Sequence, residues 1–495
     1  MLQFAESDTR ESESNRIHTN KMKRLGIAIW IMLVVLGVVS TACIEDNFTT
    51  SSSDVLAFST DTLAFDTILT DVVTPTKQFI VYNRHDKMLN ISSIKIAGES
   101  NGKFYLNVDG VKGDEFRDVE IRGNDSIFVF VEAFIDPSDE NNPIQFEEKL
   151  DFVTNGVKQQ VVITAWGQNV TRLYSHEVSA DEHFTANRPY VVFDTLRVLE
   201  GAKLTLEAGT RLYFHDKATM VVDGTLIADG TMQQPIDMRG DRLDKVVGGI
   251  GYDIMSGQWN GLRFTESSFG NELRYVNMRG SSTGVVVDSA GVEQRKLHIF
   301  NTVLQNSAGS VLTASHAWIE AEGSELSDAR RAVALLTGGK FSFVNCTFAN
   351  YYLFNIIEGP ILTLNYLFGT ENDGITPLME ANFDNCIFYG NTSDISAGDL
   401  TDSAVVLRNC LLKSNGEDDD NFISCVWGGN PKFYTVRNQY IFDYRLHDES
   451  DAIGKGNEDY CSVEAAVDRY GVARRHADGT IDIGAYTWVQ EKAEE

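Results

Sequence analysis

The chain has few cysteines, few prolines and few basic side chains for its length. Its 495 residues include six cysteines, too few for a scaffold held together by disulfides. Eight prolines beside 40 glycines exclude a collagen-like or proline-rich chain and leave many tight turns. Lysine and arginine number 42 against 71 acidic residues, giving a net charge of −29 with no basic cluster, which argues against a nucleic-acid partner.

Common catalytic and metal-binding motifs are also missing. None of the nine histidines lies between glycines, and the sequence contains no His-Glu-x-x-His, P-loop, Gly-x-Ser-x-Gly or paired metal-type cysteines. We therefore assign no catalytic residue, no metal ligand and no cofactor. What is present is a hydrophobic fraction of 43%, enough for packed cores, in a chain long enough for about three domains of ~150 residues.

The amino terminus has the features of an export signal. Residues 1–21 are polar, and we interpret them as a misannotated extension upstream of a true start at Met22. Two basic residues, an apolar run over 25–39 and the small residues 40–42 then follow. This order is typical of a secretory signal peptide, because a spanning helix needs roughly 20 apolar residues. An uncleaved membrane anchor is the alternative.

Cys43 directly follows Ser-Thr-Ala, and this resembles a bacterial lipoprotein processing site. Ser40 departs from the Leu usual in that family. The resemblance implies cleavage before Cys43 and lipidation of its thiol, which would anchor the protein in a membrane. Glu45 and Asp46 resemble the surface-export signal of Bacteroidota lipoproteins, and residues 44–55 form a tether. We expect a lipid-anchored protein at the outer membrane or cell surface.

Residues 56–170 show short runs of alternating apolar and polar residues, including 78–82, 126–131 and 150–154. Asn155-Gly156 separates two such runs and predicts a tight hairpin, because a type I′ turn needs positive φ twice. The pattern predicts an immunoglobulin-like β-sandwich, which would act as a spacer or docking module. We place a linker at 171–189.

A repeat occupies residues 190–415. Asn-Cys-x-Phe/Leu steps begin at 345, 385 and 409, and weaker matches begin at 275, 301 and 323. The spacings are 26, 22, 22, 40 and 24, so one repeat carries an insertion of about 18 residues between Tyr351 and Thr376. A period of this length built from strands predicts one coil of a parallel β-helix.

The repeat also assigns roles to particular side chains. The three small cysteines of the repeat, Cys346, Cys386 and Cys410, are predicted to point inward as reduced thiols. A second column of Asn and Asp lies five or six residues after the shared position, and we interpret it as a structural ladder at left-handed turns: Asn306, Asp328, Asn350, Asn391 and Asn415.

The repeats resemble right-handed β-helix proteins of the pectin-lyase type. Residues 239–242 (Arg-Gly-Asp-Arg) and 257–261 (Gly-Gln-Trp-Asn-Gly) are similar to segments of Bacteroidota surface members of that group. Residues 416–495 resemble the choice-of-anchor Q module, with Asp451 and Thr487 departing from its pattern. The resemblance implies a cap that closes the last coil. We leave open a disulfide between Cys425 and Cys461.

The acidic loop over 416–421 lacks EF-hand spacing, and we interpret it as a solvated loop. An enzymatic site could be built from Asp328 with Arg330, Arg331 or Lys296, but we favour a surface ion pair near a turn as the explanation of Asp328 and Arg330. Aromatic residues at the start of the insertion are candidate glycan contacts, although we favour the interpretation that they cover the flank of the β-helix: Tyr351, Tyr352 and Phe354.

The sequence thus predicts an all-β, exported surface protein with an immunoglobulin-like β-sandwich and a capped right-handed parallel β-helix. Its expected function is non-catalytic binding of polysaccharide or a surface protein. The alternative is a polysaccharide lyase or glycoside hydrolase. A carboxylate cluster, or a basic residue facing acids across a groove, would favour the enzyme.

Overall fold

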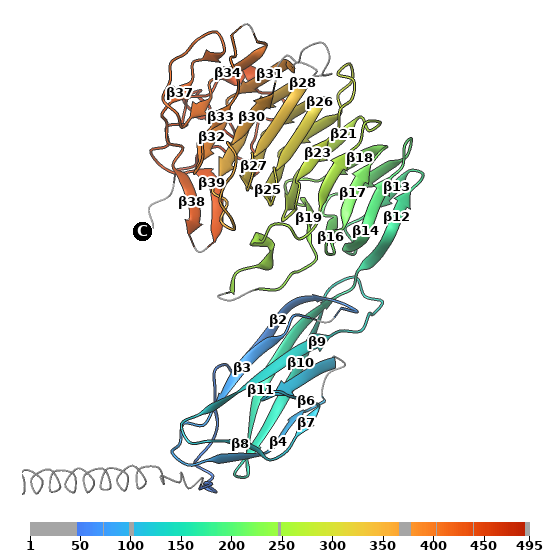
Figure 1. Cartoon of the computed structure of the whole chain (residues 1–495), viewed down its shortest axis with the longest axis vertical. Helices are drawn as coiled ribbons and strands as arrows, with labels where there is room; N and C mark the ends of the chain where they lie inside the picture. Colours follow the sequence, from blue (N-terminus) through green and yellow to red (C-terminus); the bar gives the residue numbers. More distant parts are fainter. Residues whose placement is uncertain are drawn as a thin grey trace, which may run out of the picture.

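The computed structural model describes residues 47–72, 74–98, 103–245, 249–365, 378–401, 403–438 and 440–490. This part of the chain is all-β, with a β-sandwich followed by a parallel β-helix (Figure 1). Two short 3₁₀ helices, η2 (Tyr252–Ile254) and η3 (Glu458–Tyr460), lie in connecting segments. In the described residues we find no helix with the length and apolarity needed to cross a membrane. The predicted signal peptide and Cys43 lie outside the described residues.

The sandwich packs two sheets face to face, as predicted. One sheet has the order β1-β3-β9-β5-β6, and the other has the order β2-β11-β10-β4-β7 with β8 beside β4. In β9, residues 127, 129, 131 and 133 are buried in alternation, as expected for a strand with one face on a core. The strands are β1 (Ala57–Phe58), β2 (Thr62–Leu69), β3 (Lys77–Tyr82), β4 (Leu89–Ile96), β5 (Lys103–Val108), β6 (Val111–Gly113), β7 (Glu115–Phe116), β8 (Val119–Ile121), β9 (Ser126–Phe134), β10 (Ile144–Thr154) and β11 (Val157–Gln168).

The predicted hairpin joins β10 to β11. Asn155 and Gly156 have φ of 50° and 78°, the paired left-handed backbone of a type I′ turn. Thr154 pairs with Val157 directly across the turn, and the register continues without a shift to Ile144 and Gly167.

The β-helix is one continuous sheet in which almost every strand pairs in parallel with the strand one coil away. Its strands are β12 (Thr171–Val178), β13 (Glu182–Phe184), β14 (Tyr190–Val198), β15 (Lys203–Leu206), β16 (Arg211–Phe214), β17 (Thr219–Val222), β18 (Thr225–Asp229), β19 (Ile236–Gly240), β20 (Gly261–Phe264), β21 (Asn271–Arg274), β22 (Val276–Arg279), β23 (Val285–Val287), β24 (Leu297–Phe300), β25 (Val303–Ser307), β26 (Leu312–Glu322), β27 (Glu325–Ala329), β28 (Ala334–Val344), β29 (Thr347–Asn350), β30 (Leu362–Asn365), β31 (Leu378–Asp384), β32 (Ile387–Gly390), β33 (Ile395–Ser396), β34 (Val405–Arg408), β35 (Leu411–Leu412), β36 (Phe422–Ile423) and β37 (Val426–Trp427). The expected linker at 171–189 is therefore wrong, because β12 and β13 already belong to this sheet.

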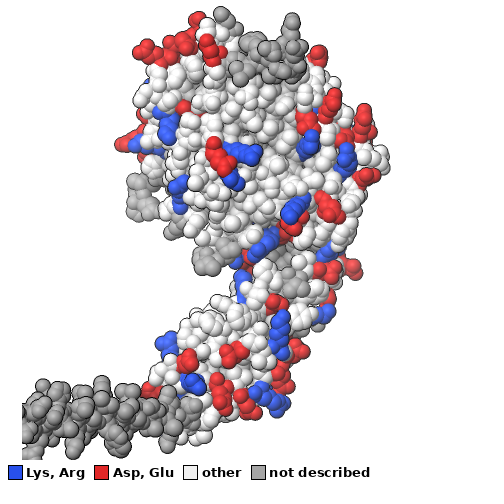
Figure 2. All heavy atoms as spheres, in the orientation of Figure 1, with Lys and Arg blue, Asp and Glu red and all other residues white. Residues whose placement is uncertain are grey.

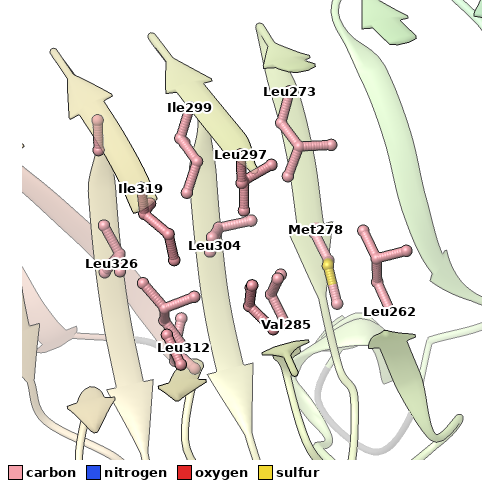
Figure 3. Packing of buried hydrophobic residues seen from close by; sticks show 14 of the residues in the cluster. Leu262, Leu273, Met278, Val285, Leu297, Ile299, Leu304, Leu312, Ile319 and Leu326 are labelled. Carbon is pink, nitrogen blue, oxygen red and sulfur yellow. The ribbon is translucent and has the colours of Figure 1, made fainter. Parts of the chain in front are cut away.

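Each coil presents three faces. Face A stacks β16, β19, β22, β25, β27, β29, β32, β35 and β37. The long strands β26 and β28 each cover the other two faces in one run. Inward residues of successive coils, such as Leu304 and Leu326, pack above one another (Figure 3). Burial of these apolar columns holds the coils together.

The repeat frame found in the sequence marks the turn that leads into face A. All six of its positions have left-handed backbone, with φ between 46° and 64°: Tyr275, Asn301, Gly323, Asn345, Asn385 and Asn409. Asparagine and glycine tolerate this conformation better than other residues. Asn385 Nδ2 also donates to Asn345 Oδ1 at 3.3 Å, so the amide ladder runs through this column.

The second polar column is less regular than predicted. Asn306 and Asp328 are left-handed, with φ of 58° and 60°. Asn350 pairs instead with the preceding coil: its Nδ2 donates to the Ala329 carbonyl at 2.9 Å, and its Oδ1 accepts from Ala329 N at 3.3 Å.

The repeat cysteines are interior thiols. Cys346, Cys386 and Cys410 are fully buried, and each Sγ donates to a carbonyl one coil away. The disulfide left open for the carboxyl-terminal region is absent, since Cys425 and Cys461 are both free. Cys461 Sγ instead donates to Asn345 Oδ1 at 3.0 Å.

The expected insertion is split by a regular strand. β30 pairs in parallel with β28 and β33, and its Leu362 and Leu364 lie in the β-helix core. Ile361, just before it, is also buried there, whereas Ile356 is 80% exposed. The extra residues of this coil therefore fall on both sides of β30. Residues 366–377, which include the last part of the expected insertion, lie outside the described residues.

The carboxyl-terminal region covers the side of the β-helix rather than only its last coil. A hairpin of β38 (Phe433–Asn438) and β39 (Ile441–Leu446) packs against face A, and residues 447–490 then form a strap. From Lys455 to Glu464 the strap contacts successively earlier coils, at Asn409, Asn385, Asn345, Glu322 and Arg274, and Arg469 then bonds to Asn301 and Asn277. The cap is thus lateral, and its position differs from the expected closure of the coil end.

Candidate functional site

A cavity of about 280 Å³ lies on face A, between the hairpin and the segment that joins β19 to β20. We call this cavity the cleft and residues 241–260 the excursion. The cleft is lined by Asp253, Ile254, Arg279, Gln305, Asn306, Asp328, Tyr352, Leu353, Phe354, Tyr440 and Phe442. Its volume is near the lower end of the ~300–1,000 Å³ range of ligand pockets, which suits one small ring more than an extended ligand.

The excursion is fastened by the Arg-Gly-Asp-Arg motif. Arg239 Nη1 pairs with Asp253 at 3.1 Å, and Arg239 Nη2 donates to the Arg242 carbonyl at 2.8 Å. The Arg242 guanidinium lies 3.6 Å from the centre of the Tyr252 ring. These contacts bring Asp253 of η2 to the wall of the cleft.

The Gly-Gln-Trp-Asn-Gly motif at residues 257–261 holds the other end of the excursion in place. Gln258 Nε2 donates to the Met255 carbonyl at 2.7 Å. Trp259 stacks on Phe214 at 4.0 Å inside the β-helix, and its Nε1 donates to the Arg279 carbonyl at 2.9 Å. A side chain at Gly240 would collide with Gln258, since its Cβ would lie 2.2 Å from Oε1. Both motifs therefore hold the excursion in place.

Two arginines and two aspartates form an ion-pair network at the cleft. Arg279 Nε lies 3.0 Å from Asp253, and Arg279 Nη1 lies 3.1 Å from Asp237. Burial works against the Arg279 charge, yet the two aspartates raise the pKa of this guanidinium. Burial and the neighbouring Arg279 lower the pKa of Arg239. Asp253 thus balances two positive charges.

Asp328 forms part of the cleft floor and is 5% exposed. Its Oδ1 accepts from Tyr444 Oη at 2.7 Å and from Tyr351 N at 2.9 Å. Burial raises the pKa of Asp328 to about 7, against the effect of these hydrogen bonds. A carboxyl group in these surroundings is partly neutral near pH 7.

The predicted glycan contacts occupy different positions. Tyr352 is buried, and its hydroxyl bonds to Ser256 Oγ at 2.5 Å, which ties the insertion to the excursion. Tyr351 is half-buried between face A and Tyr444, with ring centres 6.1 Å apart, and it does not line the cleft. Phe354 and Tyr352 do line the cleft, where the hairpin adds Tyr440 and Phe442.

The basic candidates lie elsewhere. Lys296 is buried, its Nζ donates to the Thr265 carbonyl at 2.6 Å, and burial lowers its pKa to about 8. Arg330 pairs with Glu358, not with Asp328. Arg331 is exposed and does not line the cleft. These three cations therefore do not form a site with Asp328.

The acidic loop is structural in part. Asp418 accepts from the backbone N–H groups of residues 424 and 425 and from Trp427 Nε1. Asp419 accepts from residues 421 and 422. Over the described ranges, no group of three or more His, Cys, Asp or Glu side chains could hold a metal ion.

A larger hollow of about 1230 Å³ lies between the sandwich and the β-helix. Its aromatic side chains are covered by cations: Lys77 Nζ lies 5.5 Å from the centre of Phe65, and Arg242 covers Tyr252. Each of these rings already has a cation over one face, and Phe65 is buried, so the cleft on face A is the stronger candidate.

Most of the cleft could not be predicted from a sequence pattern. Asp253, Arg279, Tyr440 and Phe442 come from three separate segments, the excursion, β22 and the hairpin, without a shared motif. The Arg-Gly-Asp-Arg motif lies near the cleft because its Arg239 pairs with Asp253, but the motif does not identify Asp253 as a residue of the cleft.

Comparison with known proteins identifies no family. No family model matches the chain, and no curated protein matches it. Among solved structures, a family 123 glycoside hydrolase from Clostridium perfringens is similar over 23% of this chain and 26% of its own, at 8% identity and a TM-score of 0.16. The catalytic unit of a GH87 α-1,3-glucanase from Streptomyces thermodiastaticus is similar over 70% of this chain and 72% of its own, at 10% identity and a TM-score of 0.24. Similarity at this level does not identify a function.

Proposed function

We propose that this protein is an exported, lipid-anchored β-helix protein that binds glycan in the cleft without catalysing a reaction. Aromatic rings and polar groups converge in the cleft, and this convergence supports the proposal. Phe354, Tyr440 and Phe442 supply faces on which a sugar ring can stack, while Gln305 and Asp328 supply hydrogen-bonding groups. Such a mixture suits a ring that is apolar on its faces and hydroxylated at its edge.

The lipid anchor and the location at the cell surface rest on the sequence around Cys43. In this arrangement the sandwich separates the β-helix from the membrane and the cleft faces outward for recognition. A surface protein is the other class of partner suggested by the sequence. The small size of the cleft favours a sugar ring over the broad surface of a protein.

The test is a panel of glycans screened for binding and for released products. We expect binding without product release. Tyr440, 46% exposed, and Tyr434, 49% exposed, lie on the same hairpin, but only Tyr440 lines the cleft in the described structure. Asn suits the left-handed backbone at residue 440, where φ is 61°. Tyr440→Asn should weaken binding about tenfold, since stacked aromatic contacts contribute ~1 kcal/mol or more.

Tyr434→Asn is the matched control and should bind like the parent. Equal binding by the parent and both variants would show that the ligand does not use the cleft. Binding to no glycan in the panel would remove the proposal.

Enzymatic cleavage of the glycan is a second candidate, favoured by the carboxylates and the basic residue in the cleft. Asp328, with its pKa near 7, could hold a proton for a leaving oxygen, and Asp253 is a second carboxylate on the same cleft. Product release that Asp328→Asn abolishes, while binding persists, would replace the binding function with this one.

A further inference from the structure

Positive charge in the cleft is already neutralised by the protein itself. Arg279 is the cation among the described lining residues, and it pairs with Asp253 and Asp237. Arg239, behind it, pairs with the same Asp253. A ligand carboxylate or sulfate entering here would find no guanidinium without an existing partner.

Negative charge is less well compensated. Asp328 faces Glu325 on its own strand β27, Tyr351 after β29 and Tyr444 on β39. Arg437 on β38 is the nearby cation, but its Nε donates to the Tyr351 carbonyl at 3.4 Å and it does not line the cleft. Glu325 is buried, and its carboxyl accepts from Ser327 and Tyr486. An anionic ligand beside Asp328 would therefore meet a carboxyl group instead of a base.

We infer that the cleft selects uncharged sugars and rejects uronates and sulfated sugars. This inference rests on the proposed glycan binding and names the ligand class. Placing an unpaired anion in a partly dry site costs several kcal/mol, whereas sugar hydroxyls can both donate and accept with the groups present. Acidic and basic side chains are interspersed on the face shown in Figure 2, so that face offers no basic track along which a polyanion could extend. The net charge of −29 adds repulsion at longer range.

The first experiment compares neutral and uronate oligosaccharides of equal length by calorimetry. We expect the neutral series to bind at least about tenfold more tightly. Equal or tighter binding of uronates would overturn the inference and leave glycan binding intact. Absence of binding in both series would overturn the proposed function and the inference with it.

A charge-release variant tests the cause. Asp253→Asn removes the shared partner of Arg239 and Arg279, so uronate affinity should rise about tenfold over the parent. Asp237→Asn removes one of the two partners of Arg279 and should raise uronate affinity by a smaller factor. It replaces Asp253→Asn as the test variant if Asp253→Asn does not fold. Asp244→Asn is the control, because Asp244 pairs with Arg242 outside the cleft. Uronate affinity at the parent level in folded Asp253→Asn and Asp237→Asn would overturn the inference.

Discussion

On the cleft floor, Asp328 holds a carboxyl group in surroundings that favour its neutral form. Its folded pKa of about 7 lies above the unfolded value of 3.8, so the folded state binds the proton more tightly. The stability from this group is complete below about pH 4 and is lost as the pH rises through 7. The loss is at most about 4 kcal/mol at ~1.4 kcal/mol per pH unit.

Asp328→Asn should therefore be more stable than the parent at pH 8 and similar to it at pH 4. Denaturant unfolding at both pH values measures the difference. Burial also raises the pKa of Glu325, so the stability of both proteins will still depend on pH through this residue. Asp420→Asn, at an exposed position, should match the parent at both pH values. An unchanged difference between parent and Asp328→Asn across this range would show that Asp328 is ionised when folded.

The repeat cysteines give a second residue-scale prediction. Cys346, Cys386 and Cys410 are fully buried, and burial raises the pKa of Cys386 well above its ordinary value. Thiolates react and buried thiols do not, so labelling of these three should be slow in the native protein and complete in denaturant. Mass spectrometry of labelled peptides would locate the sites. Fast native labelling of any one would place that rung at the surface.

Among the elements, β30 is a core strand of the longest coil, and loops flank it on both sides. Leu362→Ala should cost about 2–5 kcal/mol because the side chain is buried in the β-helix core. Ile356→Ala, six residues earlier at an exposed position, should change stability by less than about 0.5 kcal/mol. Thermal and denaturant unfolding measure both. Equal effects would show that β30 does not belong to the stack.

The repeat frame was predictable because a left-handed turn restricts sequence strongly. Asn301, Asn345, Asn385 and Asn409 occupy such turns, and the small Cys next to three of them fits the narrow interior. The split of the insertion was less predictable, because Leu362 and Leu364 look the same in a rung as in a loop packed on the flank. Strand identity there depends on pairing with β28, a long-range contact.

Across the whole molecule, most of the cleft was unpredictable for a related reason. Asp253, Arg279 and Tyr440 meet only because face A is covered from one side by the excursion and from the other by the hairpin. The fold class could be predicted, since each coil repeats a local pattern. The lateral position of the cap could not, because Lys455 to Arg469 contact six different coils without any repeat of their own.

In the proposed arrangement, attachment of the whole protein to a membrane depends on Cys43. Cys43→Ala should move the protein from the membrane fraction to the soluble fraction, because a lipidated cysteine is the expected anchor. Fractionation followed by immunoblotting measures this, with Cys461→Ala as a control that should stay in the membrane fraction. Retention of Cys43→Ala at the parent level would show that the apolar run over 25–39 is the anchor.

The direction of the strap has a consequence for the order in which the molecule becomes stable. Arg469 bonds to Asn301 and Asn277, residues 168 and 192 positions earlier. Coils that touch only their neighbours can unfold one at a time, whereas the strap, which is made late, bonds to coils made much earlier. The strap therefore couples distant coils into one cooperative unit. In the proposed export the amino terminus crosses first, so this coupling would form only after the strap has crossed. A partly translocated chain would therefore be easier to unfold than the finished molecule.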